Sequence, residues 1–283
     1  MTGDLLIPLI VVLLMVTAGT GVRAAQFKWV LRSPLVLLGG TLAQLLLLPL
    51  VAVLLITATN PAPELAAGLI LVAACPGGAL SNFYCYLGRL SVSLSVIMTT
   101  LSTLLSFATL PAILSLALPL MDPDAGSEIP IAEMMLRLVI FLLIPVGIGM
   151  LFQYLAPDMV ERLALRLRVV SQALLVGLIG LILFEQWQTV TATYRESVSF
   201  AVVFTFSAFM LGWLVGTLLG AAAEARYVLS IEFAIRNLGA AALVATTTLG
   251  RPEFLAFGAL FVVIQLPMVL LLLWLKGRFA EGS

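Results

Sequence analysis

The chain has 283 residues, of which 62% are hydrophobic and only 10% are charged, and its formal net charge is zero. Soluble domains carry about 25% charged residues, so the composition excludes an ordinary soluble protein and indicates a polytopic membrane protein. The sequence has no histidine, which excludes histidine-ligated metal centres, serine hydrolase triads and histidine proton relays, and no basic tail suggests binding of nucleic acid.

Nine apolar segments predict membrane-spanning helices, because a helical span needs about 20 apolar residues. We place the spans at about residues 5–22, 35–57, 65–87, 91–121, 132–154, 169–187, 199–219, 227–249 and 254–275. The first segment lacks a basic region and a clear cleavage site before it, so we interpret it as a span rather than a signal peptide. The expected fold is all-α, with residues 1–283 forming a single transmembrane domain.

The Lys and Arg residues between the spans are unequally distributed, which predicts the orientation of the chain. Ten lie on one side of the membrane: Arg23, Lys28, Arg32, Arg89, Arg162, Arg166, Arg168, Arg226, Lys276 and Arg278. The other side has three, Arg137, Arg195 and Arg251, together with the acidic residues Glu64, Asp122, Asp124 and Glu128. Because cytoplasmic loops are rich in Lys and Arg, we expect an integral protein of the plasma (inner) membrane with its N-terminus outside and its C-terminus in the cytoplasm.

Two of the predicted spans are interrupted near their middle. The third contains CPGGALSN at residues 75–82, where the proline removes a backbone donor and the glycines add flexibility. The eighth contains RNLG at residues 236–239. These spans are five apart and therefore cross the bilayer in opposite directions, so spans one to four and six to nine form an expected inverted repeat. Such paired broken helices indicate a substrate or ion site at the midplane and transport by alternating access.

The eighth span also contains the two charged residues that lie well inside an apolar segment, Glu232 and Arg236. A charge at the bilayer centre costs about 2.5–3.5 kcal/mol on insertion scales, so such residues pair, face a cavity or bind a ligand. Being four residues apart, they would share one face of a continuous helix and could form an ion pair. The alternative to a functional site is therefore a buried salt bridge that only fixes helix packing.

Polar side chains gather in the third and fourth spans. Ser81 and Asn82 follow the first break, and Ser95 and Thr99 are four residues apart, so that both hydroxyls can face it. Na⁺ is a hard cation that prefers several oxygen ligands, including the carbonyl groups of unwound turns. With the Glu232 carboxylate these residues would supply such a set, whereas a single Ser or Thr more often bonds its own helix.

Three stretches resemble signature segments of the bile acid:sodium symporter family. They are CPGGALSN at residues 75–82, LSVIMTTLSTLLS at 94–106 and IEFAIRNLGAAALVA at 231–245. The order and spacing of the spans resemble the nine-span form of that family. The resemblance implies a panel domain, about residues 5–57 and 132–187, and a core domain, about residues 65–121 and 199–275, in which two broken helices cross at the midplane.

The resemblance also implies two sodium sites. The first would use Ser81, Asn82, Ser95, Thr99 and Glu232. The second would use Gln44 in the second span, Glu232, and a glutamine at the position that Arg236 occupies in this chain. Because a guanidinium there would repel a second cation in a low dielectric, we expect one Na⁺ and an altered second site.

The expected function is secondary active transport, in which a Na⁺ gradient drives uptake of an organic anion such as a small carboxylate, a sulphated compound or a bile-acid-like molecule. Arg236 would be either a tethered substitute for the second ion or a ligand of the substrate carboxylate, with Asn237, Gly77 and Gly78 beside it. The alternative is a proton-coupled or uncoupled organic anion carrier. The sequence lacks a nucleophile–base pair, so we do not expect an enzyme. The expected partners are Na⁺, the anion and the lipid bilayer.

Overall fold

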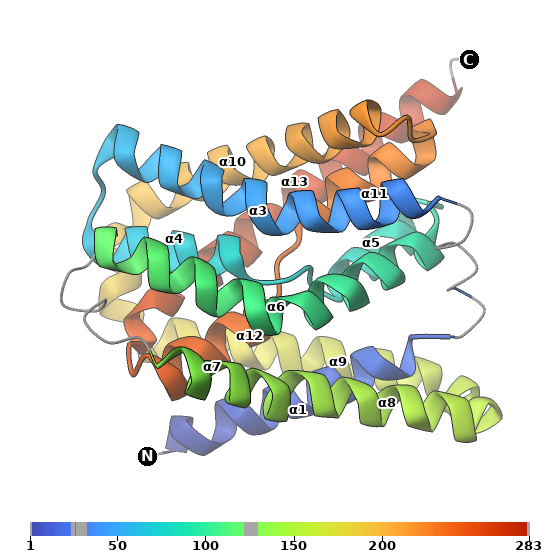
Figure 1. The fold of residues 1–283 in the computed structure, drawn as a ribbon, viewed down its shortest axis with the longest axis horizontal. Coiled ribbons are helices and arrows are strands. Elements are labelled where there is room, and N and C mark those ends of the chain that lie inside the picture. Colours follow the sequence, from blue (N-terminus) through green and yellow to red (C-terminus); the bar gives the residue numbers. More distant parts are fainter. Residues whose placement is uncertain (1, 24–25, 27–32, 122–129, 282–283) are drawn as a thin grey trace.

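The structure of the protein is a computed structural model that describes residues 2–23, 26, 33–121 and 130–281, with side chains described at 6–23, 26, 33–119 and 130–277. The helices run along the longest dimension of the molecule (Figure 1). In the described part, six of them are long and apolar enough to cross a membrane, and shorter apolar helices lie among them. The protein is therefore an all-helical membrane protein with multiple spans, as the composition predicts.

Three of these helices begin where the local sequence favours a helix start. In chain order the helices are α1 (Thr2–Thr20), α3 (Pro34–Thr59), α4 (Pro63–Ala74), α5 (Leu80–Leu87), α6 (Val92–Met121), α7 (Ile131–Leu138), α8 (Ile144–Leu155), α9 (Pro157–Glu185), α10 (Trp187–Leu218), α11 (Ala223–Ala234), α12 (Leu238–Leu243) and α13 (Leu255–Glu281). The π-helical turns η2 (Val139–Leu143) and η3 (Val244–Thr248) continue α7 and α12, and the 3₁₀ turn η4 (Pro252–Phe254) precedes α13. Pro34, Pro63 and Pro157 each begin a helix, where the missing N–H is not needed.

Helices α9 and α10 begin about 12 residues before the predicted spans. Because α9 begins at Pro157, the arginines at 162, 166 and 168 lie on its exposed first turns rather than in a loop, and Arg195 lies within α10. The predicted ends of a span are set by the length of its apolar segment. A helix can continue beyond that segment through polar residues, as long as its backbone hydrogen bonds can form. Of the other residues used to predict orientation, Lys28, Arg32, Asp122, Asp124 and Glu128, and the side chain of Arg278, lie outside the described residues.

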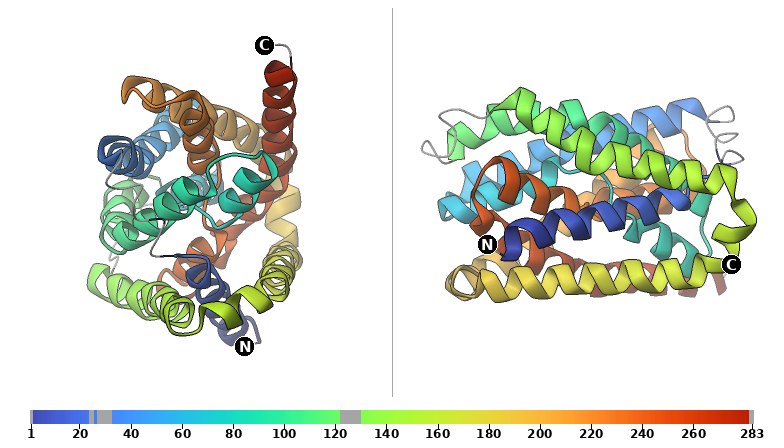
Figure 2. Two further views of the ribbon diagram at one scale, coloured as in Figure 1. Left: turned by 90° about the vertical axis from the view of Figure 1, so that its right-hand side faces the viewer. Right: turned by 90° about the horizontal axis from the view of Figure 1, so that it is seen from below.

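The helices form two groups. In the first, α1 packs along α8 and also contacts α9, and these helices lie side by side in Figures 1 and 2. In the second, α3 packs against α4, α6 and α10, and α10 packs against α11 and α13. The panel and core division stays a prediction; it places residues 35–57 in the panel, whereas the contacts of α3 lie in the second group. The reason is the face of α3 that carries Gly40 and the buried Gln44, because Gly40 lies against Met98 of α6 and Leu229 of α11.

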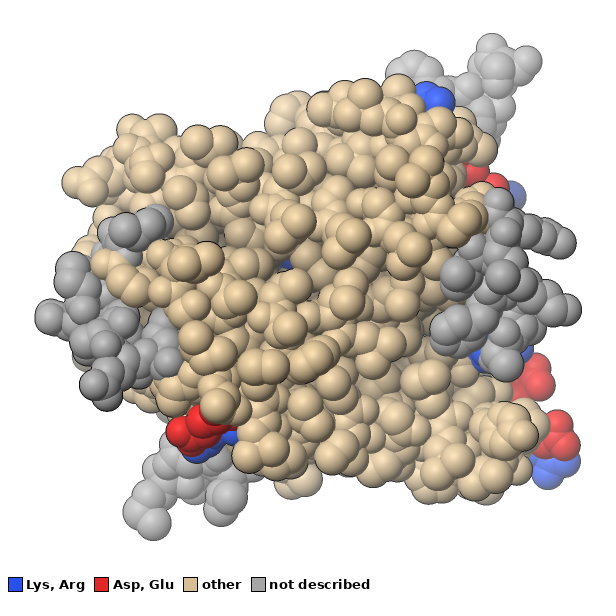
Figure 3. Space-filling model, viewed as in Figure 1, with Lys and Arg blue, Asp and Glu red and all other residues tan. Residues whose placement is uncertain are grey.

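The surface agrees with a position across a bilayer. Figure 3 shows a broad central band of one face that is almost free of Lys, Arg, Asp and Glu, with charged side chains gathered towards the two ends of the molecule. The large apolar side chains exposed along the helices include Leu46, Leu50 and Leu54 on α3. In water such a surface would be unstable, whereas lipid tails cover it without cost.

Close contact between α1 and α8 depends on two glycines, Gly19 on α1 and Gly149 on α8. A Cβ atom at Gly149 would lie 2.1 Å from the carbonyl oxygen of Val16 and 2.9 Å from Cα of Gly19. Gly149→Ala is therefore expected to force these helices apart and to destabilise the protein by about 1–3 kcal/mol, measured as a lower melting temperature in detergent. Gly147→Ala on the same helix is the control, because no atom lies within 4 Å of its Cβ position; equal losses in both variants would contradict the prediction.

Candidate ion-binding site

Both predicted interruptions of helices are present. Helix α4 ends at Ala74, and Cys75 is extended (φ −63°, ψ 153°) because the following proline disfavours the helical conformation. Helix α11 ends at Ala234, and Ile235 is extended (φ −94°, ψ 113°). The chain becomes helical again after Asn237, whose side-chain oxygen accepts a 3.1 Å hydrogen bond from the N–H of Ala240 and so caps α12.

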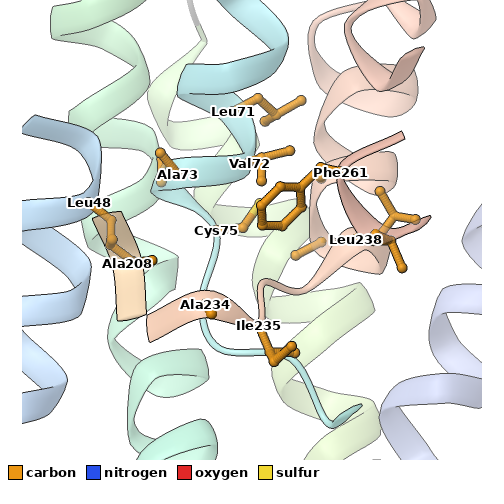
Figure 4. Close-up of a cluster of buried hydrophobic side chains, with 14 of the residues drawn as sticks. Leu48, Leu71, Val72, Ala73, Cys75, Ala208, Ala234, Ile235, Leu238 and Phe261 are labelled. Atoms are coloured by element: carbon orange, nitrogen blue, oxygen red, sulfur yellow. The ribbon is translucent and has the colours of Figure 1, made fainter. Parts of the chain in front are cut away.

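The two interruptions cross (Figure 4). Their backbone N–H and carbonyl groups form hydrogen bonds with each other. Gly77 and Arg236 form an antiparallel bridge, in which the N–H of Gly78 donates to Ile235 O (3.0 Å) and the N–H of Asn237 donates to Pro76 O (3.0 Å). A Cβ atom at Gly78 would lie 2.8 Å from the carbonyl oxygen of Arg236, so glycine is required for this approach. Unwound backbone is tolerated at membrane depth only when its polar groups are paired, and this crossing pairs them.

A cluster of hydroxyl groups surrounds the carboxylate of Glu232, which is fully buried near the end of α11. Its Oε1 accepts short hydrogen bonds from the hydroxyls of Ser81 and Ser95. The Thr99 hydroxyl lies 3.1 Å from both carboxylate oxygens, and the hydroxyl oxygens of Ser95 and Ser81 lie 3.1 Å apart. Four of the five residues predicted for the first sodium site are thus in mutual contact, brought together from α5, α6 and α11.

The fifth residue, Asn82, follows Ser81 on α5. Its side-chain oxygen is buried and accepts no hydrogen bond from the described residues. A buried oxygen without a partner costs about 1–3 kcal/mol, and a cation is a suitable partner for it. The described residues hold no group of three or more His, Cys, Asp or Glu side chains that could bind a metal ion. One carboxylate with several neutral oxygens instead suits a hard monovalent cation.

Arg236 is 3% exposed and bonds to oxygens that do not belong to Glu232. Its Nη1 donates to Gln44 Oε1 at 3.2 Å, and its Nη2 donates to the carbonyl oxygens of Ala73 (3.3 Å) and, at short range, Cys75. These carbonyls close α4, where the helix leaves acceptors unpaired and carries partial negative charge. The guanidinium therefore joins α3 and the end of α4 to the second broken helix.

The predicted ion pair between Glu232 and Arg236 is wrong. Within the described part of the chain, no ion pair of 4 Å or less joins the two side chains, and each has other partners. Residues four apart share a face only on a continuous helix, and α11 ends at Ala234, before Arg236. The two charges therefore have separate surroundings instead of a packing salt bridge. Hydroxyl groups surround the carboxylate of Glu232, and carbonyl oxygens surround the guanidinium of Arg236.

The other predicted residues lie around these two charges. The Cβ position of Gly77 is 2.9 Å from Glu232 Oε2 and 3.7 Å from Gln44 Oε1, so its backbone lies between them. Asn237 instead directs its side-chain nitrogen towards Met15 Sδ (3.9 Å) on α1. Sequence reasoning gave no role to Ser102, which accepts a hydrogen bond from the N–H of Gly77 at 3.1 Å. Its spacing of seven residues from Ser95 places it on the same face of α6 and could have identified it.

Comparison with known proteins identifies the family. The family model described as "Sodium Bile acid symporter family" matches residues 8–193, more than half of the chain. Similar curated proteins include the "Uncharacterized sodium-dependent transporter YocS" of Bacillus subtilis, which is 27% identical over 83% of this chain and 71% of its own length. The "Probable sodium/metabolite cotransporter BASS1, chloroplastic" of Arabidopsis thaliana is 26% identical over 84% of this chain and 58% of its own length.

The human "Ileal sodium/bile acid cotransporter" is 27% identical over 75% of this chain and 60% of its own length. The chain thus spans about three fifths of the length of the last two relatives. The matches are to membrane transporters and not to enzymes, as expected from the sequence. The match to the family model includes the first broken helix and the hydroxyl groups of α6. Because this match extends over more than half of the chain, the chain belongs to the sodium bile acid symporter family.

Proposed function

We propose that the protein is a sodium-coupled cotransporter of an organic anion and that Na⁺ binds at Glu232. The observation that carries this proposal is the fully buried carboxylate of Glu232 with the hydroxyls of Ser81, Ser95 and Thr99 around it. The relatives named as sodium-dependent transporters and as sodium/metabolite or sodium/bile acid cotransporters support the choice of ion and of an anionic substrate.

The chemistry of the cluster fits an ion that binds and leaves. Without Na⁺ the hydroxyls donate hydrogen bonds to the carboxylate, and a hydroxyl can rotate to turn a lone pair towards a cation instead. The oxygens of Ser81, Ser95 and Thr99, the unpaired oxygen of Asn82 and one carboxylate would then form the ligand set. Binding of a proton needs no such set, so the cluster supports sodium over proton coupling.

We further propose that Arg236 takes the place of a second Na⁺. Its guanidinium is bonded to Gln44 Oε1 and to the carbonyl oxygens of Ala73 and Cys75, which are the kinds of oxygen that coordinate a cation at a broken helix. A role in binding the substrate is the competing proposal, and one feature favours it. The Nε of Arg236 is buried without a hydrogen-bond partner among the described residues, so a donor is left for an anion.

The architecture that we propose is a nine-span inverted repeat with a panel and a core. Two features support the repeat. The helices α3, α4/α5, α6 and α10, α11/α12, α13 have the same order of long, broken and long helices, and the two broken segments exchange equivalent backbone hydrogen bonds where they cross. The packing supports a panel of α1 and α7–α9, with α3 in the core. The start of α1 and the end of α13 lie at opposite ends of the bundle (Figure 1), which supports termini on opposite sides of the membrane. The distribution of Lys and Arg is the basis for proposing an external N-terminus and a cytoplasmic C-terminus in the plasma (inner) membrane.

Transport assays test the function directly. A thermal-shift screen of carboxylates and sulphonates, with and without Na⁺, selects candidate anions, because ligands that bind the folded state raise its stability. Proteoliposomes containing the purified protein are expected to accumulate a selected anion when an inward Na⁺ gradient is imposed, and not when a proton gradient replaces it. Accumulation driven by protons alone, or independent of both gradients, would contradict the proposal.

Adjacent threonines on α6 provide a matched test of the site. Thr99→Val removes a hydroxyl that contacts Glu232, whereas the Thr100 hydroxyl bonds to Val96 O of its own helix at 2.7 Å. Because a hydrogen bond or ligand to a charged group contributes about 1.5–3 kcal/mol, Thr99→Val is expected to weaken Na⁺ binding roughly ten-fold or more, and Thr100→Val to leave it unchanged. Titration of the melting temperature with Na⁺ measures both; equal affinities in the two variants would contradict the assignment.

A further inference from the structure

The buried charges of the described residues cancel. Glu232 and Arg236 are the two charged side chains in the described part of the chain that are buried, and the remaining buried polar side chains, such as Gln44 and Gln265, are neutral. Both charged residues lie at the crossing of the broken helices and therefore belong to one rigid unit. With no ligand bound, this unit carries one negative and one positive charge and is neutral.

Binding of one ligand alone disturbs this balance. A Na⁺ at Glu232 neutralises the carboxylate and leaves the Arg236 guanidinium as an uncompensated positive charge, whereas an anion alone would leave an extra negative charge. Exposure of an uncompensated charge to the low dielectric of the membrane interior is unfavourable. While Glu232 is ionised, the crossing is neutral with no ligand or with one Na⁺ and one monovalent anion.

From this balance we infer that Arg236 makes the transport of Na⁺ and anion obligatorily coupled, with one Na⁺ and one monovalent anion carried per cycle and no net charge moved. The inference rests on the proposed sodium site at Glu232 and adds the valence of the substrate and the reason why Na⁺ does not cross alone. The substrate class is a monocarboxylate or monosulphonate.

The guanidinium is fixed well enough for this role. Arginine stays protonated in proteins, and Arg236 is held by Gln44 and by the carbonyls of Ala73 and Cys75. The charge therefore stays at the crossing when the core moves, unlike a second Na⁺, which could dissociate. With Asn237, the side chain also lines a narrow apolar gap beside Val72, Leu238 and Phe261 that admits no water molecule in this conformation. The unpaired Nε of Arg236 offers the anion a donor, although the charge balance does not require direct contact.

Exchange of radiolabelled Na⁺ for unlabelled Na⁺ tests the inference without knowledge of the substrate. Proteoliposomes are prepared with sodium sulfate as the only salt, so that no monovalent organic anion is present. The wild-type protein is expected to exchange Na⁺ at the rate of protein-free liposomes. Arg236→Met should exchange it roughly ten-fold faster or more, because the Na⁺–Glu232 pair is neutral when the guanidinium is absent and methionine supplies no oxygen ligand for a second Na⁺. Arg236→Lys keeps the charge and is expected to behave as the wild type.

Three results decide between the possibilities. The inference is overturned if the wild type exchanges Na⁺ as fast as Arg236→Met, or if a neutral variant binds radiolabelled Na⁺ yet does not exchange it. Arg236→Leu serves as a second neutral variant should Arg236→Met not fold. If the wild type binds no radiolabelled Na⁺ in detergent, the proposed sodium site itself fails, so this separate measurement distinguishes failure of the function from failure of the coupling device.

Discussion

Glu232→Gln is expected to abolish the stabilisation of the protein by Na⁺ at millimolar concentrations. Glutamine keeps the shape of the side chain and still accepts hydrogen bonds from Ser81 and Ser95, but it removes the negative charge from a ligand set that is otherwise neutral. At about 4 Å and an effective dielectric constant of about 20, a charge pair contributes about 4 kcal/mol. The affinity for Na⁺ should therefore fall by roughly 100-fold or more.

The measurement is the melting temperature in NaCl and in KCl at equal ionic strength, since a ligand of the folded state stabilises it by mass action. The control is Glu133→Gln in the first turn of α7, where the carboxylate forms a surface ion pair with Arg137 far along the chain from the site. This variant should keep the full shift caused by Na⁺. A shift of wild-type size in Glu232→Gln would show that Na⁺ binds elsewhere.

Arg236→Ala is expected to cause the largest loss of stability among substitutions at the crossing. The change removes the donors that bond Gln44 Oε1 and the carbonyls of Ala73 and Cys75, and it leaves the buried Glu232 as an uncompensated charge. Loss of one charge from a buried, hydrogen-bonded arrangement costs about 3–5 kcal/mol. The melting temperature without Na⁺ should fall by several degrees, and added Na⁺ should recover part of the loss by neutralising Glu232.

Arg137→Ala is the matched control, because its ion pair with Glu133 is partly exposed and such pairs contribute about 0–1 kcal/mol. Similar melting temperatures for Arg236→Ala and Arg137→Ala would mean that the guanidinium of Arg236 contributes little to the crossing. Its assignment as a fixed cation would then be untenable.

Much of the site could be predicted from the sequence, because its signals are local. Pro76 and the two glycines after it interrupt a helix wherever that helix lies, and the spacing of Ser95 and Thr99 places both hydroxyls on one face of α6. The structure brings these hydroxyls to Glu232, which lies far away in the sequence. The family resemblance supplied the link between these segments, which periodicity alone does not give.

The remaining features depend on long-range contacts that local rules do not contain. The rule for residues four apart predicts a pair of Glu232 with Arg236, yet α11 ends between them, and the partners of Arg236 come from α3 and the end of α4. The packing of α3 against α6 and α11 likewise depends on the fit of Gly40 against Met98 and Leu229, which the sequence of α3 alone does not contain. The helices α9 and α10 are longer than the predicted spans, because hydrophobicity indicates which residues lie in the membrane and not where a helix begins or ends.

The most direct test of the sodium site is equilibrium binding of radiolabelled Na⁺ to the purified protein. We expect one saturable Na⁺ per polypeptide for the wild type and no saturable binding for Glu232→Gln, with Thr100→Val binding as the wild type does. Two ions bound per wild-type chain would contradict the role of Arg236 as the second cation, and undiminished binding by Glu232→Gln would contradict the site itself.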